Sequence, residues 1–66
     1  MKLRQLEALR AVVASGTTTQ AADLLGLTQS AVSRLITQLE SELGLNIFDR
    51  RHGRLRITPE GQHFYD

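Results

Sequence analysis

Residues 17–40, TTTQAADLLGLTQSAVSRLITQLE, predict two helices joined by a tight turn. In the second helix, apolar side chains recur with the i, i+3, i+4, i+7 spacing that gathers them on one helix face: Val32, Leu35, Ile36, Leu39 and Leu43. The opposite face carries amides, hydroxyls and a single cation: Gln29, Ser30, Ser33, Arg34, Thr37 and Gln38. No carboxylate occurs on this helix before Glu40. One face is therefore predicted to be buried, and the other suits contact with a polyanion.

The connection between these helices has the sequence signals of a helix-turn-helix. Thr17 and Gln20 have the S/T-x-x-E/Q spacing of a capping box, and Thr28 can cap the second helix. Gly26 can close the first helix in a left-handed conformation. Ala22 is small enough to let the two helices approach closely. This pattern predicts a second helix that enters a DNA major groove. The alternative is a plain helical hairpin, which requires the apolar stripe but not the acid-free face.

Length and composition limit the other possibilities. A chain of 66 residues forms one domain, which buries about 60% of its unfolded surface, so we expect modest stability. With no cysteine, the chain has neither a disulfide framework nor a thiolate site for zinc. It contains no apolar run near the roughly 20 residues that span a bilayer and no signal-peptide core, so we expect a cytoplasmic protein without membrane contact.

The positive charge of the chain is local. Its net charge is only +1, yet four of the eight basic residues lie in the acid-free segment 50–56, namely Arg50, Arg51, Arg54 and Arg56. The overall charge alone would not indicate nucleic acid binding. The position of the arginines therefore carries the argument.

The segment before the helix-turn-helix predicts an amphipathic helix that ends at Gly16. Its apolar stripe comprises Leu3, Leu6, Leu9, Val12 and Val13, and its polar side comprises Lys2, Arg4, Gln5, Glu7 and Arg10. We expect the leucines to be buried against the back of the recognition helix, residues 28–43, which is predicted to end at Gly44.

A short antiparallel hairpin is predicted after the recognition helix. Segments 47–50 and 54–57 are its strands, and Arg51, His52 and Gly53 supply the turn. We expect Phe48, Leu55 and Ile57 to pack on the helices. Arginines on such a hairpin can grip phosphates or enter a narrow minor groove, as the wing of a winged helix does. They can also protect a strand edge against aggregation.

The last segment predicts the start of another helix. Thr58 has the position of an N-cap, Pro59 that of the first helical residue, and Glu60 favours the helix dipole. Phe64 and Tyr65 begin an apolar face near the end of the chain. A helix this short is marginal by itself, so it is either fixed to the domain by Phe64 or is the start of a longer helix.

These segments together resemble the N-terminal DNA-binding domain of LysR-type transcriptional regulators. The resemblance rests on LRQLEALRAVVASG, TQSAVSRLITQLESELGLNIFDR and ITPEG, in that order. It implies a mostly α winged helix-turn-helix with a three-helix core, a two-stranded β-hairpin wing and the start of a linker helix. We therefore expect residues 1–58 to form the DNA-binding domain and residues 59–66 to begin a truncated linker helix, with the effector-binding domain absent.

The resemblance also implies which residues contact DNA. The base-reading residues are expected to be Gln29, Ser30, Ala31, Ser33 and Arg34. Phosphate or minor-groove contacts are expected from Thr28, Thr37, Gln38, Arg50, Arg51 and Arg54. One departure from the family pattern is Thr18, which stands where a large apolar residue is common. Looser packing under the second helix is expected there.

The implied partner is a double-stranded promoter half-site. By the same resemblance, the full-length protein is a bacterial regulator that forms a homodimer or tetramer and meets a small-molecule effector only through the missing domain. We expect this fragment to be a monomer or to associate only weakly, and to bind a half-site weakly. We expect no cofactor or metal.

Two other classes of function compete with DNA binding. A winged helix can bind proteins, with its arginines facing an acidic partner. An enzyme is disfavoured because His52 and His63, the only imidazoles, have no acid or second histidine at metal-ligand or triad spacing.

Overall fold

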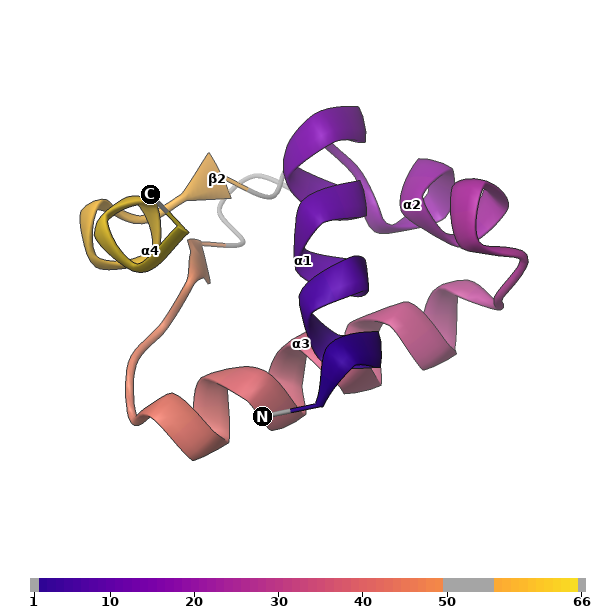
Figure 1. Cartoon of the computed structure of the whole chain (residues 1–66). Helices are drawn as coiled ribbons and strands as arrows, with labels where there is room; N and C mark the ends of the chain where they lie inside the picture. The colour runs from indigo at the N-terminus through magenta and orange to yellow at the C-terminus, as the bar shows by residue number, and fades with distance from the viewer. Residues whose placement is uncertain (1, 50–55, 66) are drawn as a thin grey trace.

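Three helices and a short hairpin followed by a fourth helix make up the molecule, for which a computed structural model describes residues 2–49 and 56–65. The elements are α1 (Leu3–Ser15), α2 (Thr18–Leu25), α3 (Gln29–Leu43), β1 (Phe48–Asp49), β2 (Arg56–Ile57) and α4 (Pro59–Tyr65). Figure 1 shows α1 crossing α3, with α2 beside the start of α3 and α4 towards its other end. The predicted winged helix-turn-helix is confirmed.

The helix ends follow the chemistry of the sequence. The hydroxyl of Thr17 accepts a hydrogen bond from the Gln20 amide at 3.0 Å, and that of Thr28 accepts one from the Ala31 amide at 3.1 Å. The turn between α2 and α3 is set by Gly26, whose φ of 68° lies in the left-handed region that favours glycine. The Leu27 amide then donates to the carbonyl of Ala22 at 2.9 Å, which closes α2 in a Schellman motif. As predicted, α1, α2 and α3 are each followed by a glycine with positive φ: Gly16, Gly26 and Gly44.

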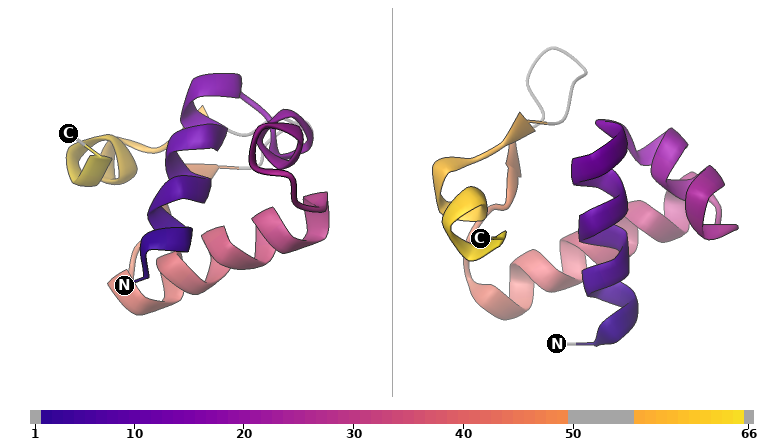
Figure 2. Two further views of the ribbon diagram at one scale, coloured as in Figure 1. Left: turned by 45° about the vertical axis from the view of Figure 1, so that its right-hand side comes forward. Right: turned by 45° about the horizontal axis from the view of Figure 1, so that its top comes forward.

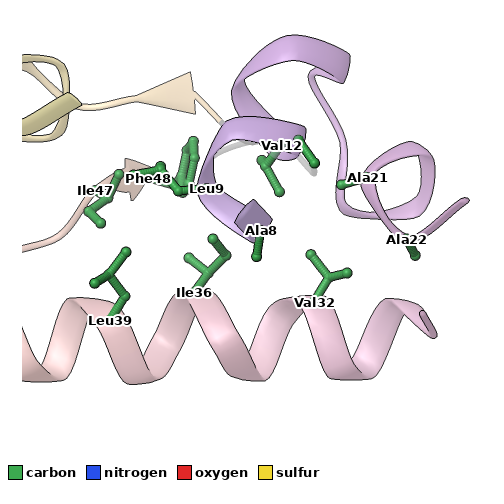
Figure 3. Packing of buried hydrophobic residues seen from close by; sticks show 11 residues of the cluster. Ala8, Leu9, Val12, Ala21, Ala22, Val32, Ile36, Leu39, Ile47 and Phe48 are labelled. Atoms are coloured by element: carbon green, nitrogen blue, oxygen red, sulfur yellow. The ribbon is translucent and has the colours of Figure 1, made fainter. Parts of the chain in front are cut away.

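The core lies where the first three helices meet. Figure 3 shows side chains of α3 pointing towards α1, and the buried cluster also takes in the start of β1. Its members include Leu9, Val12, Ala21, Ala22, Val32, Ile36, Leu39, Ile47 and Phe48. The predicted stripe of α3 is confirmed, because its central residues are buried while Leu35 and Leu43 are half-buried against the cluster.

The buried face of α1 matches the predicted one only in part: Leu9 and Val12 are buried, and Leu6 and Val13 are half-buried. Leu3 is 74% exposed, whereas Gln5 is only 2% exposed and so does not belong to the polar side. The face that packs inward contains Gln5, Ala8, Leu9 and Val12, with the i, i+3, i+4, i+7 spacing. The side-chain oxygen Oε1 of Gln5 accepts a hydrogen bond from the backbone amide of Lys2 at 2.9 Å, which offsets part of the cost of burying the Gln5 side-chain amide.

The hairpin after α3 is antiparallel. Phe48 stands opposite Ile57, and Asp49 stands opposite Arg56. Phe48 is buried and Ile57 packs against the core, while Arg56 is exposed, so the predicted alternation on the second strand is confirmed at these two positions. The predictions for Leu55 and for the turn at residues 51–53 lie outside the described residues. Figure 2 shows β2 leading directly into α4.

The start of helix α4 is joined to Ile47, the residue before β1, by polar and packing contacts. The Thr58 hydroxyl accepts from the Gly61 amide at 2.9 Å, as predicted for an N-cap, and the Thr58 amide donates to the Ile47 carbonyl at 2.8 Å. Gly61 is buried against Ile47, where an added Cβ would lie 2.8 Å from the Ile47 Cα. Phe64 packs against the core, so the short helix is fixed to the domain.

Candidate nucleic-acid interface

The outer face of α3 forms an open, shallow hollow along the helix. It is lined by Gln29, Ser30, Ser33, Arg34, Thr37, Gln38 and Ser41. Most of these side chains are exposed, Ser33 is half-buried, and none of the described residues that line the hollow is acidic. In Figure 1 the other labelled elements lie on one side of α3. Because the apolar face of α3 is buried, the predicted polar face points outward.

Three further residues lie on or beside this face, namely Thr28, Ala31 and Ser41. Thr28 is exposed, and its oxygen caps α3, which leaves the hydroxyl hydrogen free to donate to a phosphate. Ala31 is half-buried and does not line the hollow. Ser41, which the sequence analysis did not single out, extends the hollow by about one turn beyond Thr37. Ser41 could have been predicted from the sequence, because a residue four positions after Thr37 lies on the same helix face.

Glu40 does not simply end the acid-free strip. Its carboxylate oxygen Oε2 accepts hydrogen bonds from the backbone amides of Ile47, at 2.8 Å, and Phe48, at 3.1 Å. Charge-assisted bonds of this kind are stronger than neutral ones. The first carboxylate of α3 is thus bonded to the chain at the start of the hairpin, and it fixes that start relative to α3. No local pattern predicts this contact, because its partners are seven and eight residues apart and the chain reverses direction between them.

The side chain of Gln29 is held by a residue of the preceding helix. Its amide nitrogen Nε2 donates a hydrogen bond to the hydroxyl oxygen of Thr18 at 3.1 Å. Thr18 is half-buried, and Gln29 is exposed at the start of α3. The position at which the sequence departs from the family pattern therefore contacts a predicted base-reading residue.

The wing is described only at its base. Arg50, Arg51 and Arg54, which were predicted to contact phosphates or the minor groove, lie outside the described residues. Arg56 is exposed on β2. The role of the three arginines stays a prediction.

A three-helix core with an outward polar helix, followed by a hairpin, defines a winged helix-turn-helix of the DNA-binding class. A family model described as "Bacterial regulatory helix-turn-helix protein, lysR family" matches residues 3–62. The chain belongs to the LysR family.

Individual relatives agree with this assignment. Regulatory protein NocR of Agrobacterium fabrum (strain C58) is 54% identical over 57 residues, which cover 86% of this chain and 19% of NocR. The BenM DNA-binding domain, solved with benA site 1 DNA, superposes with a TM-score of 0.92 at 43% identity, covering 98% of this chain and 73% of that one. The CbnR DNA-binding domain, solved with DNA, gives 0.92 at 32% identity, covering 98% and 75%.

The relatives also bear on whether this chain is an enzyme. NocR is a regulatory protein and the matched parts of BenM and CbnR are DNA-binding domains, so the prediction that this chain is not an enzyme is confirmed. The chain spans 19% of the length of NocR. Within residues 2–49 and 56–65, no helix has both the length and the apolar character needed to cross a membrane. The chain is a LysR-type DNA-binding domain.

Proposed function

We propose that this domain recognises a double-stranded promoter half-site by placing α3 in the major groove. The observation that carries the proposal is the outward, acid-free hollow of α3. DNA presents distinct donors and acceptors in that groove, and amides, hydroxyls and a guanidinium are the side-chain groups that pair with them. The DNA complexes of the BenM and CbnR domains, which superpose closely on this chain, support the same mode of binding.

Base reading is assigned to the first two turns of α3. Gln29 can pair with adenine through one donor and one acceptor, and Arg34 can donate two bonds to guanine. Ser30 and Ser33 are small enough for the helix to approach the bases closely, and Ala31 can contact a thymine methyl group. Exposure of Gln29 and Arg34 at the surface supports these roles.

Backbone contacts fix the orientation of the domain on the duplex. Phosphate contacts are assigned to Thr28, Thr37 and Gln38, which are exposed on or beside the outward face of α3. The wing arginines Arg50, Arg51 and Arg54 are assigned phosphate or minor-groove contacts. Glu40 supports this arrangement, because it ties the base of the wing to α3.

The larger organisation follows from family membership. We propose that residues 1–58 are the DNA-binding domain and that a linker helix begins at Pro59, where α4 starts beside its Thr58 cap. In the whole protein, two such domains bind a partly palindromic site as a homodimer or tetramer, and a separate domain senses a small-molecule effector. The protein acts in the bacterial cytoplasm. By itself this chain binds a half-site weakly, with strong salt dependence from counterion release.

The base-reading role of Arg34 can be tested with duplexes selected from a random pool. Replacing Arg34 by alanine removes the bidentate donor, so we expect affinity for the selected duplex to fall by about 1–3 kcal/mol and discrimination against a scrambled duplex to relax. Fluorescence anisotropy titrations at several salt concentrations measure both quantities. The matched control is Arg10→Ala, which removes an exposed cation from α1 and is expected to leave discrimination unchanged.

Unchanged discrimination in Arg34→Ala would refute its base-reading role. Equal affinity of the unmodified chain for selected and scrambled duplexes would refute the function as a whole. It would favour the rival interpretation, in which the winged helix binds an acidic protein.

A further inference from the structure

One hydrogen bond links the two helices of the helix-turn-helix at the edge of the DNA-facing surface. It joins Gln29 Nε2, on the first turn of α3, to Thr18 Oγ1, on the first turn of α2, at 3.1 Å. Thr18 is not the residue that caps α2, because that role belongs to Thr17. The Thr18 hydroxyl is therefore available to the Gln29 amide.

We propose that Thr18 is a positioning residue for base recognition, which sets the orientation of the Gln29 amide and thereby the base that Gln29 prefers. A glutamine amide has an acceptor oxygen and a nitrogen with two donor hydrogens. When one of those hydrogens is bound to Thr18, the nitrogen is held towards α2. The oxygen and the remaining hydrogen stay available to a base edge, which is the combination that adenine requires.

The same contact has little value for the fold but more value in a complex. Both side chains lie at the surface, where a neutral hydrogen bond competes with water and contributes little to stability. Docking on DNA excludes water from this edge, and hydrogen bonds strengthen in a less polar environment. A side chain that is already ordered also loses less conformational entropy on binding. Loss of the Thr18 hydroxyl should therefore affect recognition rather than folding.

The chemistry of position 18 allows a sharp comparison of variants. Thr18→Val keeps the branched shape but cannot bond to the amide, whereas Thr18→Ser keeps the hydroxyl. Thr19→Val is the matched control, because it makes the same replacement at the next residue of α2, which is exposed. The unmodified chain and these three variants are compared on the selected duplex and on duplexes with each base pair changed in turn. Gln29→Ala identifies the base pair that Gln29 reads.

We expect Thr18→Val to reduce the preference at that one base pair by about threefold to tenfold, the value of one neutral hydrogen bond. Preferences at all other base pairs, including those read by Arg34, should be unchanged. Thr18→Ser and Thr19→Val should keep the original preference. In a Gln29→Ala background, Thr18→Val should have no further effect. The urea midpoint of Thr18→Val should match that of the unmodified chain, because the variant changes a surface contact.

The inference rests on the proposed base-reading role of Gln29, and the results separate the two. If Gln29→Ala leaves every base preference unchanged, the role of Gln29 is refuted and the inference falls with it. If Gln29→Ala removes one preference that Thr18→Val retains, the role of Gln29 stands and the inference alone is overturned. A uniform loss of affinity for all duplexes in Thr18→Val would also overturn it, because such a loss indicates a phosphate contact by Thr18 itself.

Discussion

The two parts of this molecule are held together by different kinds of contact. In the helical core, α1, α2 and α3 meet through aliphatic side chains, among them Leu9, Val32 and Ile36, that are fully or almost fully buried. In the C-terminal arm, residues 45–49 and 56–65, apolar packing is supplemented by a few bonds to the backbone from Glu40 and Thr58. Hydrophobic packing therefore orients the recognition helix by itself, whereas the base of the wing is placed by apolar packing of Ile47 and Phe48 together with polar contacts at single positions.

The largest effect is expected from a cavity in the helical core. Ile36 lies at the centre of the buried face of α3, and Ile36→Ala should lower the free energy of unfolding by about 2–5 kcal/mol. A domain this small has roughly 3–5 kcal/mol to lose, so much of the protein should unfold. Urea titration followed by circular dichroism measures the loss.

The control for this prediction is an aliphatic truncation at the surface. Leu24→Ala on α2 removes a side chain that is 68% exposed, and we expect a change within about 0.5 kcal/mol. Equal losses in the two variants would contradict the role assigned to the core of α3.

An intermediate and local effect is expected in the C-terminal arm. Gly61→Ala places a Cβ against the backbone of Ile47, and overpacking of this kind costs about 1–3 kcal/mol. Because α4 makes few contacts with α1, α2 and α3, we expect it to shift while those helices keep their structure. Amide chemical shifts should change from Ile47 to the end of α4 and hardly at all in α3.

His63→Ala serves as the control, since it replaces an exposed side chain of the same helix. Shift changes in Gly61→Ala that spread through the buried face of α3 would show that the two parts are not separable in this way.

The smallest effect is expected where the two parts are joined. Glu40→Gln keeps an acceptor but removes the charge that strengthens both bonds to β1, so we expect a local loss of about 1 kcal/mol. The amides of Ile47 and Phe48 should then exchange hydrogen about fivefold faster. Glu7→Gln, which removes an exposed carboxylate from α1, should leave these exchange rates unchanged. Protection of both amides at the original level would argue against a role for Glu40 in placing the wing.

The features that could be predicted from the sequence are those that depend on hydrophobic periodicity and on helix caps. The buried and exposed faces of α3 follow from the 3.6-residue repeat. Thr17, Thr28 and Thr58 cap their helices through amides three residues away, and Gly26 closes α2 within four residues. Both signals are contained in neighbouring residues. The helices and the polar face of α3 could therefore be predicted from the chain alone.

The errors and omissions involve contacts that depend on how helices approach one another. In α1, the leucine pattern located Leu9 and Val12 correctly but placed Leu3 in the buried face and Gln5 outside it, because close helix packing selects the small Ala8 beside Gln5, and neither residue carries a strong hydrophobic signal. The bonds of Glu40 to β1 and of Gln29 to Thr18 join residues that come together only after the chain has turned. No periodicity records such pairs.

The position of Glu40 has a consequence for how such a domain can change its target over evolutionary time. Positions 29, 30, 33, 34, 37 and 38 line the outward hollow, so new side chains there should have little effect on folding and, under the proposed function, would change the preferred operator. Glu40 lies on the same helix but serves the hairpin, so a substitution there disturbs architecture instead of selectivity. Substitutions that change the preferred DNA sequence are therefore expected to be tolerated on the outward face of α3 and constrained at Glu40.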